Sequence, residues 1–174
     1  MALPLALPIE TPRLRVRALH SRDLAPLMAV NGDQEVTKHL PYKAWQSLSD
    51  AQAWHDRMRG IESGGAALQM VVAYRTDDVA IGTCLLFRHD AEKACIELGF
   101  VLGRAHWRTG VMGEAMGALV ERAFDELRLE RMIAVIERPN VASAALVRRL
   151  GFSFEAAEEG EVELDRYALT SRAA

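Results

Sequence analysis

This chain has few cysteines and no long apolar runs, and both absences limit the classes of protein to which it can belong. Cys84 and Cys95 are the only cysteines, and neither belongs to a CxxC pair or a Cys/His cluster, so no zinc or redox motif is indicated. No stretch approaches the ~18 consecutive apolar residues of a membrane span. The apolar start contains Pro4 and Pro8 and has no basic residue ahead of it, which is atypical of a signal peptide. We therefore expect a cytoplasmic protein with no metal and no membrane partner.

An excess of positive charge is also missing. The 21 Lys and Arg residues and 24 Asp and Glu residues give a formal net charge of -3. Proteins that bind nucleic acid broadly usually carry a strongly basic surface, so we expect no nucleic-acid partner. No repeat or linker divides the 174 residues, of which 50% are hydrophobic. A chain of this size can form one core, and the sequence predicts a single domain over residues 1–174.

The pattern of apolar residues predicts an α/β domain. Period-two alternation and short apolar runs predict seven strands, at residues 13–17, 67–74, 79–87, 94–102, 131–136, 152–157 and 162–169. Helical spacing predicts four helices, at residues 21–32, 49–61, 115–127 and 141–150, with a short polar turn or helix at 33–39. We expect Ser21 and Ser49 to cap the first two helices and Gly151 to end the last. Short polar connections predict antiparallel hairpins within a mixed sheet.

The most informative stretch is residues 107–115, which read W-R-T-G-V-M-G-E-A and open a long helix after a strand. The first turn of a helix has N–H groups without intrahelical partners and carries partial positive charge. Gly110 and Gly113 allow a ligand to approach the backbone closely. Such a turn can bind a phosphate through main-chain donors, although a glycine-containing loop before a helix is often only a turn. The spacing matches neither GxxxxGK[ST] nor GxGxxG.

This stretch resembles the acetyl-CoA-binding motif W-G-K-G-x-M-T-E-A of the GNAT N-acetyltransferases, in the form common in their RimJ/RimL-type branch. Arg108 and Thr109 stand where small and Lys residues are common, and Gly113 replaces a usual Thr. Further segments resemble the same branch in the same order, so the resemblance covers nearly the whole chain. They are residues 11–17 (T-x-R-L-x-L-R) with Asp23, 34–36 (x-E-V), 96–100 (A-E-I-G-Y), and 140–143 with 151–152 (N-x-x-S…G-F).

The resemblance implies a fold, a cofactor and a reaction. The fold is a central mixed, mostly antiparallel sheet of about seven strands, flanked by about four helices and splayed between the fourth and fifth strands. The cofactor is acetyl-CoA, and the reaction is direct acetyl transfer to a primary amine. Backbone amides of residues 108–113 would hold the pyrophosphate, and the pantetheine would lie along strand 94–102. The implied cofactor-binding residues are Phe100, Val101, Arg108, Thr109, Gly110, Val111, Met112, Gly113, Asn140 and Ser143, with an amide near Phe100 or Val101 as the oxyanion donor.

The reaction needs a base to take a proton from the acceptor amine, and Glu97 is the first candidate. It interrupts an apolar run, alternation places it on one face with Cys95, and burial there would raise its pKa from about 4.3 toward neutrality. The alternatives are a carboxylate paired with an arginine, or a water chain that serves as the base. Glu137, at the end of the next strand beside the splay, is the second candidate. His106, next to the predicted phosphate loop, is the third.

Other side chains have both a functional and a structural interpretation. Ser143 matches a family position near the CoA sulfur, where its hydroxyl would protonate the leaving thiolate, but it also suits the start of a helix. Asn140 is expected to cap that helix and to hydrogen-bond the pantetheine. Tyr42, Trp45 and Trp54 lie in a segment that borders the acceptor cleft in such folds, and they either line a pocket or pack in the core.

The leading prediction is an N-acetyltransferase that acts on a protein N-terminal α-amine, as the ribosomal-protein alanine acetyltransferases of this branch do. The first alternative is a small-molecule amine acetyltransferase, acting on a polyamine, an amino acid or an antibiotic. The second is a non-catalytic module that binds acyl-CoA. Either enzyme is compatible with a homodimer.

Overall fold

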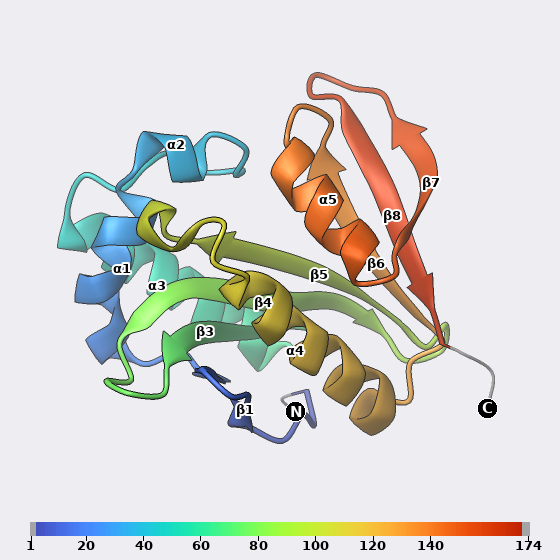
Figure 1. Cartoon of the computed structure of the whole chain (residues 1–174), viewed down its shortest axis with the longest axis horizontal. Coiled ribbons are helices and arrows are strands. Elements are labelled where there is room, and N and C mark those ends of the chain that lie inside the picture. Colours follow the sequence, from blue (N-terminus) through green and yellow to red (C-terminus); the bar gives the residue numbers. More distant parts are fainter. Residues whose placement is uncertain (1–2, 172–174) are drawn as a thin grey trace.

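An eight-stranded sheet is the framework of the computed structural model, which describes residues 3–171 (Figure 1). Residues 1, 2 and 172–174, which the single-domain prediction also covers, lie outside the described range. The strand order is β1-β2-β3-β4-β5-β6-β8-β7, and all neighbours are antiparallel except β5 and β6. The strands are β1 Ile9–Glu10, β2 Leu14–Ala18, β3 Leu68–Tyr74, β4 Ala80–Asp90, β5 Cys95–Leu102, β6 Arg131–Glu137, β7 Ser153–Glu158 and β8 Leu164–Thr170. The predicted mixed, mostly antiparallel sheet is confirmed, with β1 as an additional short strand.

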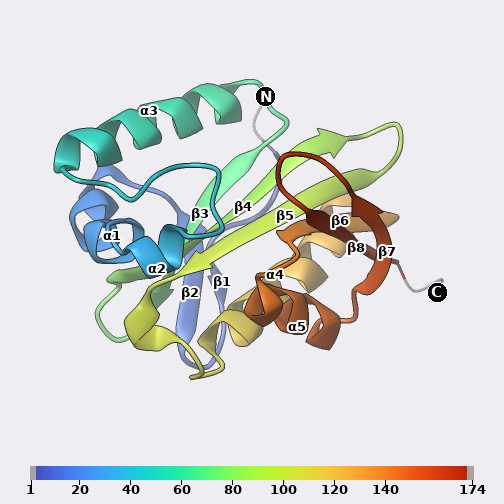
Figure 2. The same ribbon diagram turned by 90° about the horizontal axis from the view of Figure 1, so that it is seen from above.

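Helices cover both faces of this sheet. They are α1 Leu24–Asn31, α2 Gln34–Thr37, α3 Leu48–Ser63, α4 Val111–Leu127 and α5 Val141–Arg149. Figure 2 shows α1 and α3 on one face and α4 and α5 on the other. Gly151, at a φ of 98°, follows the end of α5 as predicted. No helix among residues 3–171 combines the length and apolar character that crossing a bilayer requires.

Each face has its own core. The larger core joins the sheet to α4 and α5, and α4 contributes Val111, Met112, Ala115, Met116, Leu119, Val120 and Ala123 at helical spacing. The smaller core joins α1 and α3 to β3 and contains Trp45 and Trp54, whose ring centroids lie 5.2 Å apart. Both tryptophans are buried. Of the two alternatives for these tryptophans, pocket lining and core packing, the structure shows core packing.

The predicted caps of the first two helices are wrong by one or two residues. Helix α3 is capped by Ser47 rather than Ser49, because the carboxylate of Asp50 accepts the backbone N–H of Ser47 at 3.0 Å. A short 3-10 turn precedes α1, and its cap is His20 rather than Ser21. In both places the cap is the residue whose backbone N–H donates to a carboxylate three positions later: Ser47 to Asp50, and His20 to Asp23.

Strands β5 and β6 pair only where they begin. Their parallel contact runs from Cys95 opposite Arg131 to Glu97 opposite Ile133, and within the described chain it goes no further. From there the strands diverge, β5 toward α1 and β6 toward the start of α5, as Figure 1 shows. The predicted splay between the fourth and fifth strands is thus confirmed. Because β1 was not predicted, these two strands are numbered β5 and β6 in the structure.

Arg17 of β2 is held in a buried ion pair with Asp23, just before α1. Its Nη1 and Nη2 each donate to one carboxylate oxygen of Asp23 at 2.8 Å, and its Nε donates to Oδ1 of Asp78 at 2.9 Å. The remaining two donors reach the backbone oxygens of Ala18 and Asp78, so all five N–H groups have partners. Hydrogen bonding from Arg17 lowers the pKa of Asp78. The side chains of Arg17 and Asp23 are only 8% and 3% exposed.

Candidate active site

The first turn of α4 offers a set of backbone donors. Gly110, the residue before the helix, has a left-handed φ of 77°, and Arg108 is left-handed at 61°. The first hydrogen bond of this turn is donated by the N–H of Glu114 to the carbonyl of Gly110 at 3.1 Å. The N–H groups of residues 111–113 precede that bond, so they and the positive end of the helix dipole are free to bind an anion.

The carboxylate of Glu114 ties this turn to the beginning of β2. Its Oε1 accepts from the Thr11 hydroxyl at 2.5 Å and from the Arg13 N–H at 3.0 Å, and its Oε2 accepts from Arg13 Nε at 2.7 Å. Arg13 Nη1 also donates to the carbonyl of Thr109 at 3.0 Å. Partial burial opposes a low pKa for Glu114, but these hydrogen bonds still hold it below the usual value. Two motif segments far apart in the sequence thus fix one loop.

In the part of β5 after Glu97, which no longer pairs with β6, every second backbone N–H points toward β6. The N–H of Gly103 donates to β4 at 2.9 Å, whereas the carbonyl of Ala94 accepts from β6. Backbone groups alternate in direction along a strand, so the amide of Phe100 faces the gap between β5 and β6 and that of Val101 faces β4. Of the two amides considered as oxyanion donors, only that of Phe100 points into the gap.

Helix α5 packs against the first turn of α4. A Cβ built on Gly113 would lie 3.5 Å from Cδ1 of Leu146, which is in the second turn of α5. Oδ1 of Asn140 accepts from the N–H of Ser143 at 3.2 Å, so the predicted cap of α5 is confirmed. The N–H of Asn140 also donates to the carbonyl of Glu137 at 2.8 Å, so Asn140 and the first turn of α5 follow directly on the separated end of β6.

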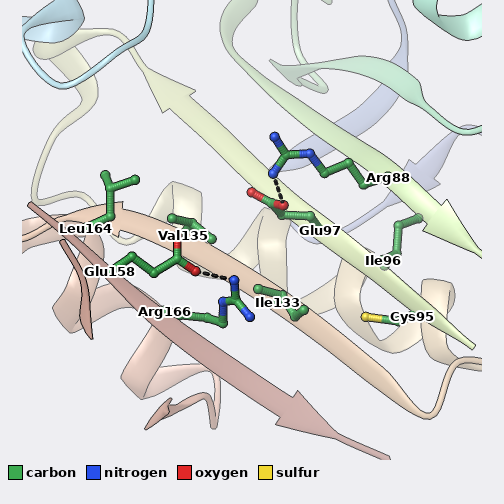
Figure 3. A pocket seen from close by; sticks show the side chains of 9 residues that line it. All are labelled: Arg88, Cys95, Ile96, Glu97, Ile133, Val135, Glu158, Leu164 and Arg166. Atoms are coloured by element: carbon green, nitrogen blue, oxygen red, sulfur yellow. Dashed lines mark hydrogen bonds and ion pairs between the residues drawn. The ribbon is translucent and has the colours of Figure 1, made fainter. Parts of the chain in front are cut away.

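Glu97 borders a cavity of about 360 Å³ on the face opposite α4 (Figure 3). Its Oε2 accepts from Arg88 Nη1 at 2.7 Å, and its side chain is 12% exposed. Of the alternatives given for Glu97, the structure therefore shows a carboxylate paired with an arginine. Across the cavity, Arg166 pairs with Glu158. The lining residues, with equal numbers of guanidinium and carboxylate groups, are Arg88, Cys95, Ile96, Glu97, Ile133, Val135, Glu158, Leu164 and Arg166.

Glu137, the second candidate base, has a histidine partner that the sequence analysis missed. Nδ1 of His39, in the segment after α2, lies 2.7 Å from Oε2 of Glu137 at the end of β6. The two residues are 98 positions apart, and no motif or periodicity singles out His39. Only the tertiary structure could have brought this residue to attention.

Two further candidates have other partners. Nδ1 of His106 lies 3.3 Å from the hydroxyl of Tyr74 on β3. The Tyr42 hydroxyl donates to Oδ1 of Asn31 at 2.8 Å, and burial raises the pKa of Tyr42. The partners of both residues, Tyr74 and Asn31, therefore lie outside β5 and β6.

Comparison with known proteins identifies the fold and the family. The family described as "Acetyltransferase (GNAT) domain" matches residues 13–153. An uncharacterized N-acetyltransferase, p20 of Bacillus licheniformis, is 31% identical over 147 residues, which cover 84% of this chain and 83% of the relative. RimL, a ribosomal L7/L12 alpha-N-protein acetyltransferase solved with coenzyme A, has a TM-score of 0.83 at 15% identity, covering 94% of this chain and 98% of its own. The microcin C7 self immunity acetyltransferase MccE, solved with acetyl-CoA and AMP, has a TM-score of 0.82 at 16% identity, covering 92% and 94%.

At these identities the two solved structures establish a shared fold. The p20 relative and the family match over residues 13–153 also establish the family. The match from residue 13 to residue 153 includes the α4 turn, the separated strands and the first turn of α5. The protein is an acetyltransferase, and this chain belongs to the GNAT family.

Proposed function

We propose that this protein transfers the acetyl group of acetyl-CoA to the α-amine at the N-terminus of a protein. The observation that carries the proposal is the gap between β5 and β6, together with the free first turn of α4, the helix that follows β5. An anion-binding turn and an open strand edge suit a ligand that has a diphosphate at one end and a long arm with amide groups. Direct transfer in a ternary complex requires that the acceptor reach the same gap from the other face.

The residues present fit acetyl-CoA, which supplies an activated acetyl thioester. The amides of residues 108–113 would hold the pyrophosphate, because they lie at the positive end of the α4 dipole and Gly110, at positive φ, has no Cβ to keep a ligand from the backbone. The amide of Phe100 would donate to the oxygen on which negative charge develops. Asn140 would hydrogen-bond the pantetheine, and the Ser143 hydroxyl would return a proton to the sulfur. Val101 would contact the pantetheine as part of the same strand.

Two features support a protein N-terminus as the acceptor. The segments that resemble the RimJ/RimL branch extend along most of the chain, and the fold is shared with RimL, an alpha-N-protein acetyltransferase. The cavity beside Glu97 carries as many guanidinium as carboxylate groups, whereas a polyamine site would be expected to be acidic. The cytoplasmic location and the homodimer stay predictions from the sequence.

A small molecule that carries both an amine and a carboxylate is the second candidate acceptor. The ion pairs Arg88–Glu97 and Arg166–Glu158 on two sides of the cavity favour it, since each could bind one end of a zwitterion. MccE has the same fold and is named as an immunity acetyltransferase, so the fold itself is compatible with acceptors other than ribosomal proteins.

Thermal unfolding with acetyl-CoA tests the cofactor assignment. A ligand present at a hundredfold excess over its Kd stabilises the folded state by about 2.7 kcal/mol. At roughly 2–4 °C per kcal/mol for a chain of this size, Tm should rise by about 5–10 °C. CoA lacking the acetyl group should give a similar rise, whereas free adenosine should not. An unchanged Tm at saturating acetyl-CoA would contradict the assignment.

Thiol release then tests the reaction and the acceptor. We expect CoA thiol to appear with peptides that have a free α-amine and not with the same peptides after N-terminal blocking. Turnover with amino acids or antibiotics but not with peptides would favour the second acceptor. Binding of acetyl-CoA without thiol release from any amine would identify a non-catalytic module instead.

A further inference from the structure

We propose that His39 is the general base of this acetyl transfer and that Glu137 holds its ring in the reactive tautomer. The inference rests on the acetyltransferase function proposed above, and it assigns the proton transfer to a residue that the sequence did not single out. It changes the role of Glu137 from a base to a positioning residue.

The contact between the two side chains fixes where the ring proton lies. An ionised carboxylate only accepts hydrogen bonds, so Nδ1 of His39, 2.7 Å from Oε2 of Glu137, carries a proton. In the neutral ring the lone pair is then on Nε2, which has no hydrogen-bond partner among residues 3–171. The two side chains are 21% and 23% exposed, so the ring is both held and accessible.

The pair stands at the gap where transfer is proposed. Glu97 is opposite Ile133 in the last paired position, so counting four residues along each strand sets Val101 across the gap from Glu137. Side chains alternate between faces, so Glu137 lies on the same face as Glu97, away from α4. The amide of Phe100 faces the same gap. A base held by Glu137 and a donor for the oxyanion therefore border one opening from different strands.

The contact is not explained by stability. It is the one side-chain hydrogen bond in the described chain that joins residues 19–64 to residues 130–171. Both side chains are partly exposed, and an ion pair or hydrogen bond that water can reach contributes little to stability. The fold gains little from a single contact across two otherwise separate segments, whereas a base needs such an orienting partner.

Glu97 is less suited to the same task. Its carboxylate already accepts from Arg88 Nη1 at 2.7 Å, so one of its two oxygens is occupied by a guanidinium. Glu97 also lies in the paired part of β5, before the strands separate. Imidazole, in contrast, takes up and returns a proton near neutral pH. Glu97 is better placed to attract the ammonium group of the acceptor.

The proposed step conserves atoms and charge. Nε2 of His39 takes one proton from the acceptor ammonium, and Glu137 stabilises the imidazolium that forms. The freed lone pair on nitrogen forms the bond to the acetyl carbon as the carbon–sulfur bond breaks and its electron pair leaves with sulfur. The second proton of the nitrogen passes to the sulfur through the Ser143 hydroxyl. The imidazolium then returns its proton to solvent, so each turnover releases one proton.

Replacing His39 by asparagine separates the catalytic role from a structural one. The introduced side-chain amide keeps a donor near the position of Nδ1 but has no counterpart of Nε2. We expect His39→Asn and His39→Ala to lower kcat by about 100-fold or more, the usual range for loss of a general base, with little change in KM for acetyl-CoA. The neighbouring exposed Lys38→Ala is the control and should keep normal turnover.

Glu137 is tested by a conservative variant and by a spectroscopic signature. Glu137→Gln keeps an acceptor for Nδ1–H, so its kcat should fall less than that of Glu137→Ala, with KM for acetyl-CoA unchanged in both. Nitrogen NMR of the His39 ring at pH 8, without any ligand, should show the Nδ1–H tautomer in the wild type. In Glu137→Ala the ring should shift toward the Nε2–H form, which is the more stable one in free histidine.

The outcomes distinguish the two proposals. Normal turnover in His39→Asn, or an Nε2–H tautomer in the wild type, would overturn this inference while leaving the acetyltransferase function intact. Loss of kcat in Glu97→Gln together with full activity in His39→Asn would return the base to Glu97. No thiol release by the wild type with any amine would overturn the proposed function and this inference with it.

Discussion

Replacing Asp23 by Ala is expected to lower the free energy of unfolding by about 3–5 kcal/mol. Asp23 accepts from both Nη atoms of Arg17 at 2.8 Å, and both side chains are almost fully buried. Without the carboxylate, a buried guanidinium loses its main charged partner and cannot be rehydrated. At roughly 2–4 °C per kcal/mol, Tm should fall by about 6–20 °C, measured by thermal and urea unfolding.

A surface arginine of the same cluster provides the control. Arg22 pairs with Asp78 at 2.7 Å, but its side chain is 63% exposed. Arg22→Ala should therefore change the free energy of unfolding by no more than about 1 kcal/mol. A similar small loss in Asp23→Ala would show that the buried pair does not stabilise the fold. The Asp23→Asn variant should fall between the two, because it keeps one acceptor for Arg17 without the charge.

Replacing Gly110 by Val is expected to raise the Kd for acetyl-CoA about ten- to a hundredfold. Gly110 has a φ of 77°, which a β-branched residue adopts only with strain, so the backbone before α4 must rotate. That rotation redirects the free amides of residues 111–113. Loss of even one hydrogen bond to a charged group costs about 1.5–3 kcal/mol, which corresponds to this range of affinity. Calorimetric titration with acetyl-CoA measures it directly.

Gly110→Asn is the matched variant for this test. Asn tolerates the left-handed region, and a Cβ at this position would meet only Nη2 of Arg13, at 3.6 Å. It should therefore retain most of the affinity for acetyl-CoA and the Tm of the wild type. Equal weakening in both variants would point to crowding by the side chain, and wild-type affinity in Gly110→Val would remove the α4 turn from the binding site.

Local patterns were enough to predict most of the strands and the helices, because each is long and regular in its periodicity. The exceptions have physical reasons. Strand β1 has two residues, Ile9 and Glu10, too few to alternate visibly, and it exists because β2 offers a partner. Ser49 satisfies the general preference for a cap, but only the position of Asp50 decides that Ser47 takes the role.

The candidate site could be predicted where it depends on the backbone and not where it depends on contacts between distant side chains. The glycine at 110 and the turn before α4 are local features, and so is the cap at Asn140. The Arg88 partner of Glu97 follows from the register of β4 against β5, and the His39 contact with Glu137 follows from how the α2 segment is placed across the sheet. Neither placement has a periodic signal in the sequence.

Because pairing between β5 and β6 ends early, the second half of β5 has a neighbouring strand on one side only. Although β5 lies inside the sheet, we expect the backbone amides of this half to exchange with solvent as those of an edge strand do. Beyond Glu97 and Ile133, the N–H groups of Phe100 and Leu102 face the gap, while those of Gly99 and Val101 face β4. In deuterium oxide the first pair should exchange quickly and the second slowly, in strict alternation within one strand. Acetyl-CoA, by filling the gap, should slow exchange of the first pair and leave the second unchanged. The sheet would then be continuous only when its substrate is bound.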